Sequence, residues 1–274
     1  MAITGNQKEE LNALCLARAV VNRVIAELET DNNEYDSLNE AWHVHQPFLE
    51  EGWFPGETFP KTTIEYTVVD EESKININIA EAGLLFGLFS QTLPEPTAVS
   101  IVECILDWRD ADSNPKPEGA EDEYYSTLSP PYQCKNAPFD LLEEILAVKG
   151  MTPDLLHNLT VFSKGKINVN TSSEEVLLAT GISRNAAKAI IRYRAGSDGV
   201  EGSEDDRVFA IMEDVASVPG VTELDYYQLD NFACFKSTHF TITVKVTIGN
   251  LRKEITAVLD RSTKPTSILL WRER

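Results

Sequence analysis

Hydrophobic residues at the two ends of the chain follow patterns that predict one long helix and a sheet. Over residues 7–31, apolar side chains recur every three or four positions with alanines between them, which is typical of an amphipathic helix. This stripe consists of Leu11, Leu14, Val21, Val24, Ile25 and Leu28. Elsewhere at both ends, apolar residues alternate with polar ones, which is the pattern of strands that bury one face.

The alternating segments predict an antiparallel sheet. The expected strands cover residues 64–68, 75–79, 240–248, 251–260 and 267–271. A short polar break at residues 70–73 predicts that the first two strands form a hairpin. Gly249 and Asn250 both tolerate positive φ, so they predict a two-residue turn between two of the C-terminal strands.

The middle of the chain has a different pattern. Between about residues 80 and 235, apolar residues fall at helical spacing and the alternation almost disappears. We therefore expect an α+β protein in which a long N-terminal helix packs on an antiparallel sheet and a large all-α domain is inserted between strands of that sheet. The expected domains are residues 1–80 for the first part of the scaffold, 81–235 for the insertion and 236–274 for the C-terminal strands.

The middle region also repeats itself. At residues 149–152, 180–183 and 219–222, a glycine is followed by an apolar residue and then by serine or threonine. This pattern predicts a left-handed glycine that closes one helix and a hydroxyl N-cap that opens the next, as in a helix-hairpin-helix corner. A second echo pairs residues 74–80 with residues 166–172, each a short extended piece that leads into a helix.

Composition narrows the range of partners. The 274 residues are 42% hydrophobic and 25% charged, which is ordinary for a globular protein. With 44 acidic and 24 basic residues, the net charge of −20 repels nucleic-acid phosphates and anionic lipid headgroups. No apolar run is long enough to span a membrane, and the first residues show neither the basic nor the apolar region of a secretory signal.

The four cysteines do not form a metal or redox motif. Cys15, Cys104, Cys134 and Cys234 include no Cys-x-x-Cys pair, so neither a zinc ribbon nor a thioredoxin-like site is indicated. Cys104 and Cys134 flank one acidic loop. The sequence leaves open whether these two form a disulfide or lie buried as free thiols.

The strongest candidate for chemistry is the acidic segment, residues 107–124. It contains seven carboxylates and two basic residues. Carboxylates this crowded repel one another unless a cation lies among them, so the segment is a candidate calcium loop, with a solvated acidic loop as the alternative. It is not an EF-hand, because Pro115 stands where that loop needs glycine.

Other motifs indicate chemistry more weakly. The acidic glycine-rich segment, residues 196–206, predicts a flexible loop. His43 and His45 could place two imidazoles on one strand face, but no third ligand accompanies them. Asp110 and Asp112 fit the Asp-x-Asp of metal-dependent transferases, although no phosphate-binding glycine loop is evident. The glycine corners fit a helix-hairpin-helix nucleic-acid-binding protein, which the net charge opposes.

Taken together, several motifs resemble the minor pseudopilin K family of bacterial type II secretion systems, over nearly the whole chain. These motifs are residues 74–78, 107–112, 119–124, 148–152 and 166–172, with Pro115, Pro131, Tyr132, Asn136 and Pro138 between them. Their order and spacing carry the resemblance. It implies a pilin-like fold with a large inserted helical domain, in agreement with the hydrophobic pattern.

The resemblance also implies a function and a location. Members of the family are non-enzymatic subunits at the tip of the periplasmic pseudopilus, where they assemble with the minor pseudopilins I and J and help to initiate or cap the pseudopilus for protein secretion. Members begin with a leader and an apolar helix that anchors them in the inner membrane. We therefore expect a periplasmic protein whose helix over residues 7–31 is the soluble half of such an anchor helix.

Calcium is the cofactor that the resemblance implies. The inserted domain of family members binds structural Ca²⁺ through the loop that runs from Asp-x-Asp to Glu-Asp. Carried over motif by motif, the expected ligands are Asp110, Asp112, Glu121 and Asp122, with Asp107 and Asn114 as further candidates. The secreted substrates, the residues that contact partners and the number of ions do not follow from the sequence.

Overall fold

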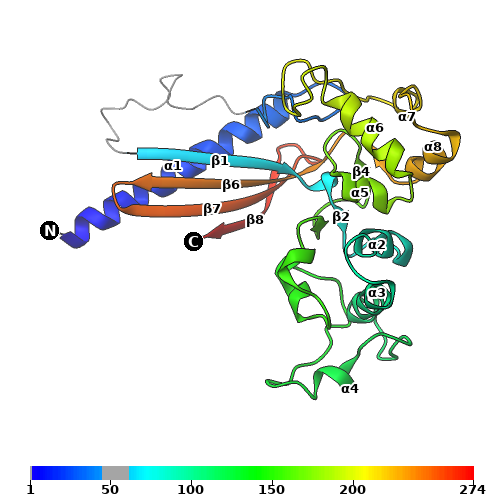
Figure 1. The fold of residues 1–274 in the computed structure, drawn as a ribbon. Coiled ribbons are helices and arrows are strands. Elements are labelled where there is room, and N and C mark those ends of the chain that lie inside the picture. Colours follow the sequence, from blue (N-terminus) through cyan, green and yellow to red (C-terminus); the bar gives the residue numbers. More distant parts are fainter. Residues whose placement is uncertain (1, 45–61) are drawn as a thin grey trace. The chain divides into compact units, whose positions relative to one another are not determined.

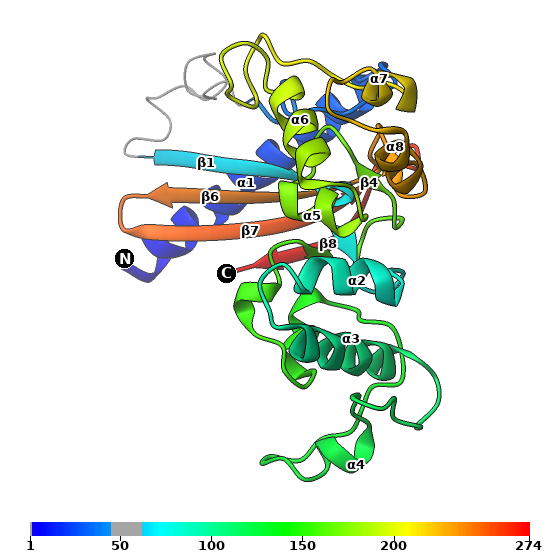
Figure 2. The ribbon, with the colours of Figure 1, turned by 45° about the vertical axis from the view of Figure 1, so that its right-hand side comes forward.

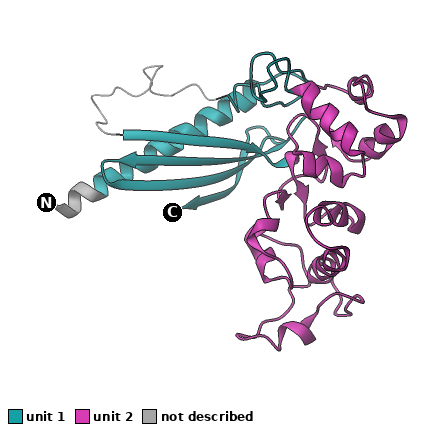
Figure 3. Ribbon diagram, in the orientation of Figure 1, with its two compact units in different colours: residues 1–71, 195–208, 236–274 teal, residues 72–194, 209–235 magenta. Residues whose placement is uncertain are grey.

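The described residues form two compact units. The computed structural model describes residues 2–44 and 62–274, with side chains from residue 7 onward. Unit 1 comprises residues 1–71, 195–208 and 236–274, and unit 2 comprises residues 72–194 and 209–235 (Figure 3). Two segments therefore lie in a different unit from the expected one, since residues 72–80 belong to unit 2 and residues 195–208 to unit 1.

Unit 1 is a long helix on an antiparallel sheet (Figure 1). Its elements are α1 (Ala2–Thr30), β1 (Thr62–Asp70), β6 (His239–Ile248), β7 (Leu251–Asp260) and β8 (Ser267–Glu273), with the strands in the order β1-β6-β7-β8. The inward face of the sheet and one face of α1, including Leu16, Val20 and Val24, form one buried core. This confirms the predicted helix-on-sheet scaffold, although Leu11 of the predicted stripe is 60% exposed. Within the described residues, no helix is both long and apolar enough to cross a membrane.

Strand β1 pairs with β6, which lies far away in the sequence. The register sets Tyr66 opposite Val244 and Val68 opposite Ile242 on the face that α1 covers. The predicted hairpin of residues 64–68 and 75–79 is wrong. A 3₁₀ turn at Glu71–Ser73 ends β1, and the next strand pairs within unit 2 instead. Alternation fixes which face of a strand is buried, but it does not choose the partner strand.

Among the described residues, unit 2 is helical apart from two pairs of two-residue parallel strands (Figure 2). Its helices are α2 (Ala82–Phe89), α3 (Glu95–Arg109), α4 (Asp122–Tyr125), α5 (Glu174–Ala179), α6 (Arg184–Arg194), α7 (Met212–Ala216) and α8 (Glu223–Asp230), with 3₁₀ turns η2 (Leu142–Ala147) and η3 (Pro153–Leu155). Its strands are β2 (Ile75–Asn76), β3 (Leu159–Thr160), β4 (Ile167–Asn168) and β5 (Ala233–Cys234). Strand β2 pairs with β3, and β4 pairs with β5.

Unit 2 contains the same framework twice. The first repeat, residues 74–160, is framed by β2 and β3, and the second repeat, residues 166–194 and 209–234, is framed by β4 and β5. In the first repeat, the Asn78 side chain accepts a hydrogen bond from the Phe139 backbone N–H (2.8 Å) and donates one to its carbonyl (2.9 Å). In the second, Asn170 makes the same two bonds to Phe209, at 2.8 and 2.9 Å.

An arginine completes the framework in each repeat. Arg109, at the end of α3, donates to the carbonyls of Ile77 and Ala80. Arg194, at the end of α6, donates to the carbonyls of Val169 and Ser172, both at 2.7 Å. The echo between residues 74–80 and 166–172 is thus the visible part of a larger structural repeat. The equivalent helices α2 and α5 pack closely, because a Cβ on Gly87 would lie 2.6 Å from the Ala179 carbonyl oxygen.

The glycine corners have the predicted backbone. The three glycines all have positive φ: Gly150 (84°), Gly181 (94°) and Gly220 (106°). Ser183 accepts a hydrogen bond from the Ala186 N–H and Thr222 accepts one from the Asp225 N–H, both at 3.2 Å, which confirms these two N-caps. The predicted cap at Thr152 is wrong, because the turn that follows is a short 3₁₀ segment in which its hydroxyl caps nothing.

Candidate functional site

The acidic segment folds around one buried carboxylate. Asp107 lies in the last turn of α3 and is fully buried. It accepts hydrogen bonds from the backbone N–H groups of Lys116 (3.1 Å) and Ala120 (2.9 Å). Gly119 permits this approach, because a Cβ at this position would lie 1.9 Å from Asp107 Oδ2. The sequence Gly119-Ala120 therefore wraps the loop backbone onto the end of α3.

A lysine lies between two of the carboxylates. Lys116 Nζ is 2.9 Å from Asp107 Oδ1 and 2.8 Å from Asp110 Oδ2. Burial lowers the pKa of the Lys116 ammonium, but the hydrogen bonds to Asp110 and Asp107 outweigh this effect and raise the pKa above its usual range. The ammonium therefore stays charged at neutral pH and neutralises part of the cluster.

Glu121 has no such counter-ion. Its side chain is 3% exposed, and neither buried carboxylate oxygen accepts a hydrogen bond of normal geometry. Burial raises the pKa of Glu121, with the Cys134 thiol lowering it and the nearby charges of Asp107, Asp110 and Asp122 raising it further. Asp110 Oδ1 is likewise buried without a hydrogen bond. Buried carboxylate oxygens without partners are costly unless a cation or proton satisfies them.

The other expected ligands are divided between two places. Asp122, at the start of α4, accepts a hydrogen bond from the Cys134 N–H at 2.7 Å and lies near Glu121. Asp112 is exposed, and its Oδ1 accepts from the Asn114 N–H (2.8 Å) and side-chain amide (2.9 Å). The structure thus brings Asp107, Asp110, Glu121 and Asp122 together, whereas Asp112 and Asn114 bond to each other at the exposed side of the loop.

This arrangement is chemically suited to a hard cation. In the part of the chain that the structure describes, no three or more His, Cys, Asp or Glu side chains are placed so as to hold a metal ion. Lys116, rather than a metal ion, lies between Asp107 and Asp110. The unpartnered oxygens of Glu121 and Asp110 are nevertheless of the type that Ca²⁺ prefers, so the donor set fits the expected ion.

Two residues of the candidate site do not follow from the sequence, namely Lys116 and Asn136. Lys116 was counted only as one of two bases in the segment, although its spacing from Asp110 lets one ammonium reach two carboxylates. Asn136 has a φ of 49°, and its buried Oδ1 has no hydrogen bond, so it is a further candidate oxygen ligand. The Pro and Asn residues around position 136 were the available signal, since asparagine tolerates a left-handed backbone.

The glycine-rich segment connects Arg194 and Phe209 of the second repeat in the sequence, but its residues belong to unit 1. The pattern predicted a flexible loop, but the structure shows turns held by two carboxylates. Asp205 accepts hydrogen bonds from the Ser197 N–H and hydroxyl, and Asp206 accepts one from the Gly202 N–H at 2.6 Å. The bonds from Ser197 hold the pKa of Asp205 well below its usual range. These carboxylates are therefore satisfied by their own loop.

Comparisons with known proteins agree with this architecture. Residues 73–162, which contain the first repeat and the acidic segment, match the family described as "Type II secretion system (T2SS), protein K". The whole fold is similar to a chain in the crystal structure of the GspK-GspI-GspJ complex of the type 2 secretion system from enterotoxigenic Escherichia coli, with a TM-score of 0.77 and 20% identity over 99% of each chain.

Curated relatives carry the same description. Type II secretion system protein K of Pseudomonas aeruginosa is 25% identical over 90% of this chain and 73% of its own length. That of Aeromonas hydrophila is 24% identical over 93% of this chain and 82% of its own length. The match to protein K of Pectobacterium carotovorum is 28% identical but spans only 54% of either protein.

The chain is similar to type II secretion system protein K, through the family model over residues 73–162 and through relatives that align along most of its length. The structure agrees with the family fold inferred from its motifs, a pilin-like scaffold with a helical insertion. Cys104 and Cys134 are both free and buried here, with their thiols 3.7 and 3.8 Å from the carbonyls of Glu118 and Asp107. Of the His43 and His45 pair, His45 lies outside the described residues.

The glycine corners are poorly suited to bind phosphate. At the second corner, the Ser183 N–H already donates to Asp225 Oδ1 at 2.7 Å. Of the basic residues that follow, Arg184 pairs with Glu174 at 3.3 Å, and Arg194 is used by the framework. Since a phosphate-binding corner needs free backbone N–H groups, this geometry argues against the nucleic-acid-binding alternative.

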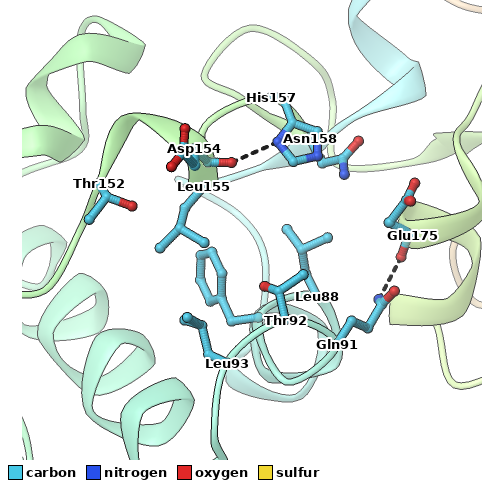
Figure 4. A pocket seen from close by; sticks show the side chains of 11 residues that line it. Leu88, Gln91, Thr92, Leu93, Thr152, Asp154, Leu155, His157, Asn158 and Glu175 are labelled. Carbon is cyan, nitrogen blue, oxygen red and sulfur yellow. Dashed lines mark hydrogen bonds between the residues drawn. The ribbon is translucent and has the colours of Figure 1, made fainter.

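A pocket of about 270 Å³ is lined by the first repeat, with Glu175 of the second repeat at one side (Figure 4). Leu88, Leu93 and Leu155 give it an apolar lining. On one side the Gln91 side chain donates to the Glu175 carbonyl at 2.9 Å, which links α2 to α5. None of the expected metal ligands lines this pocket, so it is separate from the acidic segment.

Proposed function

We propose that this chain is a non-enzymatic structural subunit at the tip of a type II secretion pseudopilus, in the periplasm, and that it assembles there with the minor pseudopilins I and J. The observation that carries the proposal is the architecture itself, a long helix on a four-stranded sheet with a helical unit inserted between neighbouring strands. The similar structure from E. coli is a GspK-GspI-GspJ complex, which supports these partners.

The insertion supports an end position. A pilin-like scaffold packs through its long helix, and each subunit inside a filament has neighbours on both sides. Unit 2 adds a helical body larger than unit 1. Such bulk fits a subunit that receives no further neighbour on one side, and therefore a subunit that initiates or caps the pseudopilus.

Assembly is tested by co-expressing the chain with the I and J pseudopilins of the same secretion system. We expect the three proteins to co-purify and to elute together in size-exclusion chromatography. Leu11→Asp, on the exposed side of α1, should weaken the complex without unfolding the chain, because Leu11 is 60% exposed. The matched control Leu224→Asp changes a leucine that is 66% exposed on α8, and it should leave the complex intact. Separate elution of all three proteins would contradict the proposal.

We also propose that the acidic segment binds structural calcium. The ligands would come from Asp110, Glu121 and Asp122 with Asp107 beside them, while Asp112 and Asn114 would reach the ion only by exchanging their mutual hydrogen bonds for it. Bound calcium would neutralise carboxylates that repel one another and satisfy the buried Glu121 oxygens. Its role is to fix the shape of the loop.

A thermal melt with and without chelator tests the calcium proposal. A ligand that binds only the folded state at one hundred times its Kd stabilises the protein by about 2.7 kcal/mol. We expect the melting temperature to rise with Ca²⁺ and to fall when a chelator is added. A melting temperature that is indifferent to both would remove the calcium part of the proposal and leave the assembly part standing.

A further inference from the structure

The cluster in the acidic segment already contains one cation. Lys116 Nζ is within hydrogen-bond distance of both Asp107 and Asp110, at 2.9 and 2.8 Å. The two oxygens of Asp110 differ, because Oδ2 accepts a hydrogen bond from Lys116 whereas Oδ1 is buried without a partner. Glu121, which is 3% exposed, also has two unpartnered oxygens near Asp110.

We propose that Lys116 is a built-in competitor of calcium, which holds the Asp107–Asp110 pair in the calcium-free protein and is displaced when calcium binds. This inference rests on the calcium binding proposed above. A divalent ion on Asp110 Oδ1 and an ammonium on Asp110 Oδ2 would be like charges on the two oxygens of one carboxylate. Asp107 and Glu121 are buried beside them, so solvent screens this repulsion incompletely, and calcium on Asp110 would weaken the hold of Lys116 and favour its release.

The loop is able to release this side chain without unfolding. Asp107 is held independently by the backbone N–H groups of Lys116 and Ala120, at 3.1 and 2.9 Å. These bonds do not depend on the lysine side chain. Lys116 is also 34% exposed, so its ammonium has a short path to solvent when a divalent ion takes its place.

Competition of this kind raises the calcium concentration that is needed to load the site. The ion must replace an existing counter-ion, so its apparent affinity is weaker than the same carboxylates would otherwise give. In return, the calcium-free loop keeps a folded form, because Lys116 neutralises two of its carboxylates. The loop would therefore be stable before it is loaded, and it would load only where calcium is plentiful.

The test is calcium titration calorimetry of the full chain after chelator treatment, together with thermal melts. Lys116→Met removes the ammonium and keeps the apolar stem. We expect it to bind calcium at least about tenfold more tightly than the wild type, to melt at a lower temperature without calcium, and to match the wild type in saturating calcium. Lys116→Arg retains the charge and should keep an affinity close to that of the wild type.

Lys135→Met is the matched control. Lys135 pairs with Asp140 and Glu144, at 2.7 and 2.6 Å, outside the cluster, so its replacement should leave calcium affinity unchanged. A wild-type measurement guards against misfolding of the variants. The NMR signal of the Lys116 side chain should move toward that of an exposed lysine as calcium is added.

The outcomes separate the two proposals. If the wild type binds calcium and Lys116→Met binds it equally or more weakly, or if the Lys116 signal stays in place, the competitor role is wrong while the calcium site stands. If only Lys116→Met binds calcium, competition is supported in its strongest form. If neither protein binds calcium, the calcium proposal fails and this inference fails with it.

Discussion

The two repeats of unit 2 share a framework but use the loop within it differently. In both, an asparagine binds the backbone of a distant phenylalanine, and an arginine binds two carbonyls next to that asparagine. In the first repeat, the loop between arginine and phenylalanine contains most of the acidic segment and packs on the buried Asp107 of α3, and its carboxylates are partly unsatisfied. In the second, it contains the glycine-rich segment, whose carboxylates are satisfied by local N–H and hydroxyl groups.

This difference separates acidity from ion binding. Both loops are rich in carboxylates, so composition alone would rank them alike. What distinguishes them is where the oxygens point. Glu121 is buried and accepts no hydrogen bond of normal geometry, although the Cys134 thiol lies near it, while Asp205 is exposed and accepts hydrogen bonds from Ser197 and Ser203. Only the first loop therefore has buried oxygens that a cation would satisfy.

The largest effect is expected from breaking the framework itself. Asn170→Ala removes two hydrogen bonds to Phe209 from a site where the asparagine is 3% exposed, so it should destabilise the protein by about 2–4 kcal/mol. Asn78→Ala removes the equivalent bonds at a half-buried site and should cost about half as much. Chemical denaturation measures both. A negligible loss in either variant would show that the asparagine does not hold that repeat together.

Matched glycine substitutions compare the two loops. Gly119→Ala places a methyl group against Asp107, so we expect a loss of about 2 kcal/mol together with loss of the calcium response. Gly196→Ala strains a φ of 64° and approaches the Asp205 carbonyl oxygen within 2.5 Å, so it should cost about 1–2 kcal/mol and leave the calcium response unchanged. Melts with and without chelator distinguish the two variants. An altered calcium response in Gly196→Ala would place the ion elsewhere.

Asp225, at the glycine corner of the second repeat, should contribute to the free energy of unfolding in a way that depends on pH. Burial raises the pKa of Asp225, but hydrogen bonds from Thr222 and Ser183 outweigh it, and the pKa is lowered overall. A carboxyl group whose pKa is lowered by folding stabilises the protein at pH values above its ordinary pKa. This stability is lost as the pH falls through the lowered pKa of the folded state. Asp225→Asn should therefore cost about 1–2 kcal/mol at neutral pH and progressively less in acid. The check is denaturation across a pH series, and a pH-independent cost would contradict the assignment.

Glu121 predicts the opposite pH dependence in the first repeat. The pKa of Glu121 is raised in the folded protein. Without calcium, its contribution to the free energy of unfolding is therefore fully present at pH values below the ordinary pKa of glutamate, and it is lost as the pH rises through the raised pKa. Glu121→Gln removes this decline, so it should stabilise the calcium-free protein by about 1 kcal/mol at neutral pH and abolish the calcium response. Chelator-treated melts at acidic and neutral pH measure this. A variant less stable than the wild type would mean that a cation-independent partner satisfies Glu121.

Much of the scaffold could be predicted from the sequence. The helix stripe and the C-terminal strands are local patterns, and α1, β6, β7 and β8 follow them closely. The partner of β1 could not be predicted, because alternation at residues 64–68 matches β6 and residues 75–79 equally well. The short echo at residues 74–80 and 166–172 was visible, whereas the bonds from Asn78 to Phe139 join residues too far apart to leave a pattern.

The sequence identified the candidate carboxylates, but it did not predict how they are arranged. Spacing and resemblance nominated Asp107, Asp110 and Glu121, which the structure gathers. They also identified Asp112 as a candidate. Its carboxylate instead accepts a hydrogen bond from the Asn114 N–H in an Asx turn. Lys116 was overlooked because a lone base in an acidic run looks like surface charge. Its partners are known only once the turn at Gly119 brings the backbone back to α3.

The pairing of Asp70 with Phe240 has a consequence for the order of folding. As the chain emerges from the ribosome, β1 appears long before β6 and has no strand to complete its edge. Unit 2 appears in between, and its paired strands, β2 with β3 and β4 with β5, are closer in the sequence than β1 and β6 are, which favours their earlier formation. Once folded, it would act as a short connection rather than a long one, which lowers the entropic cost of joining β1 to β6. Early folding of the insertion would thus speed closure of the scaffold that carries it.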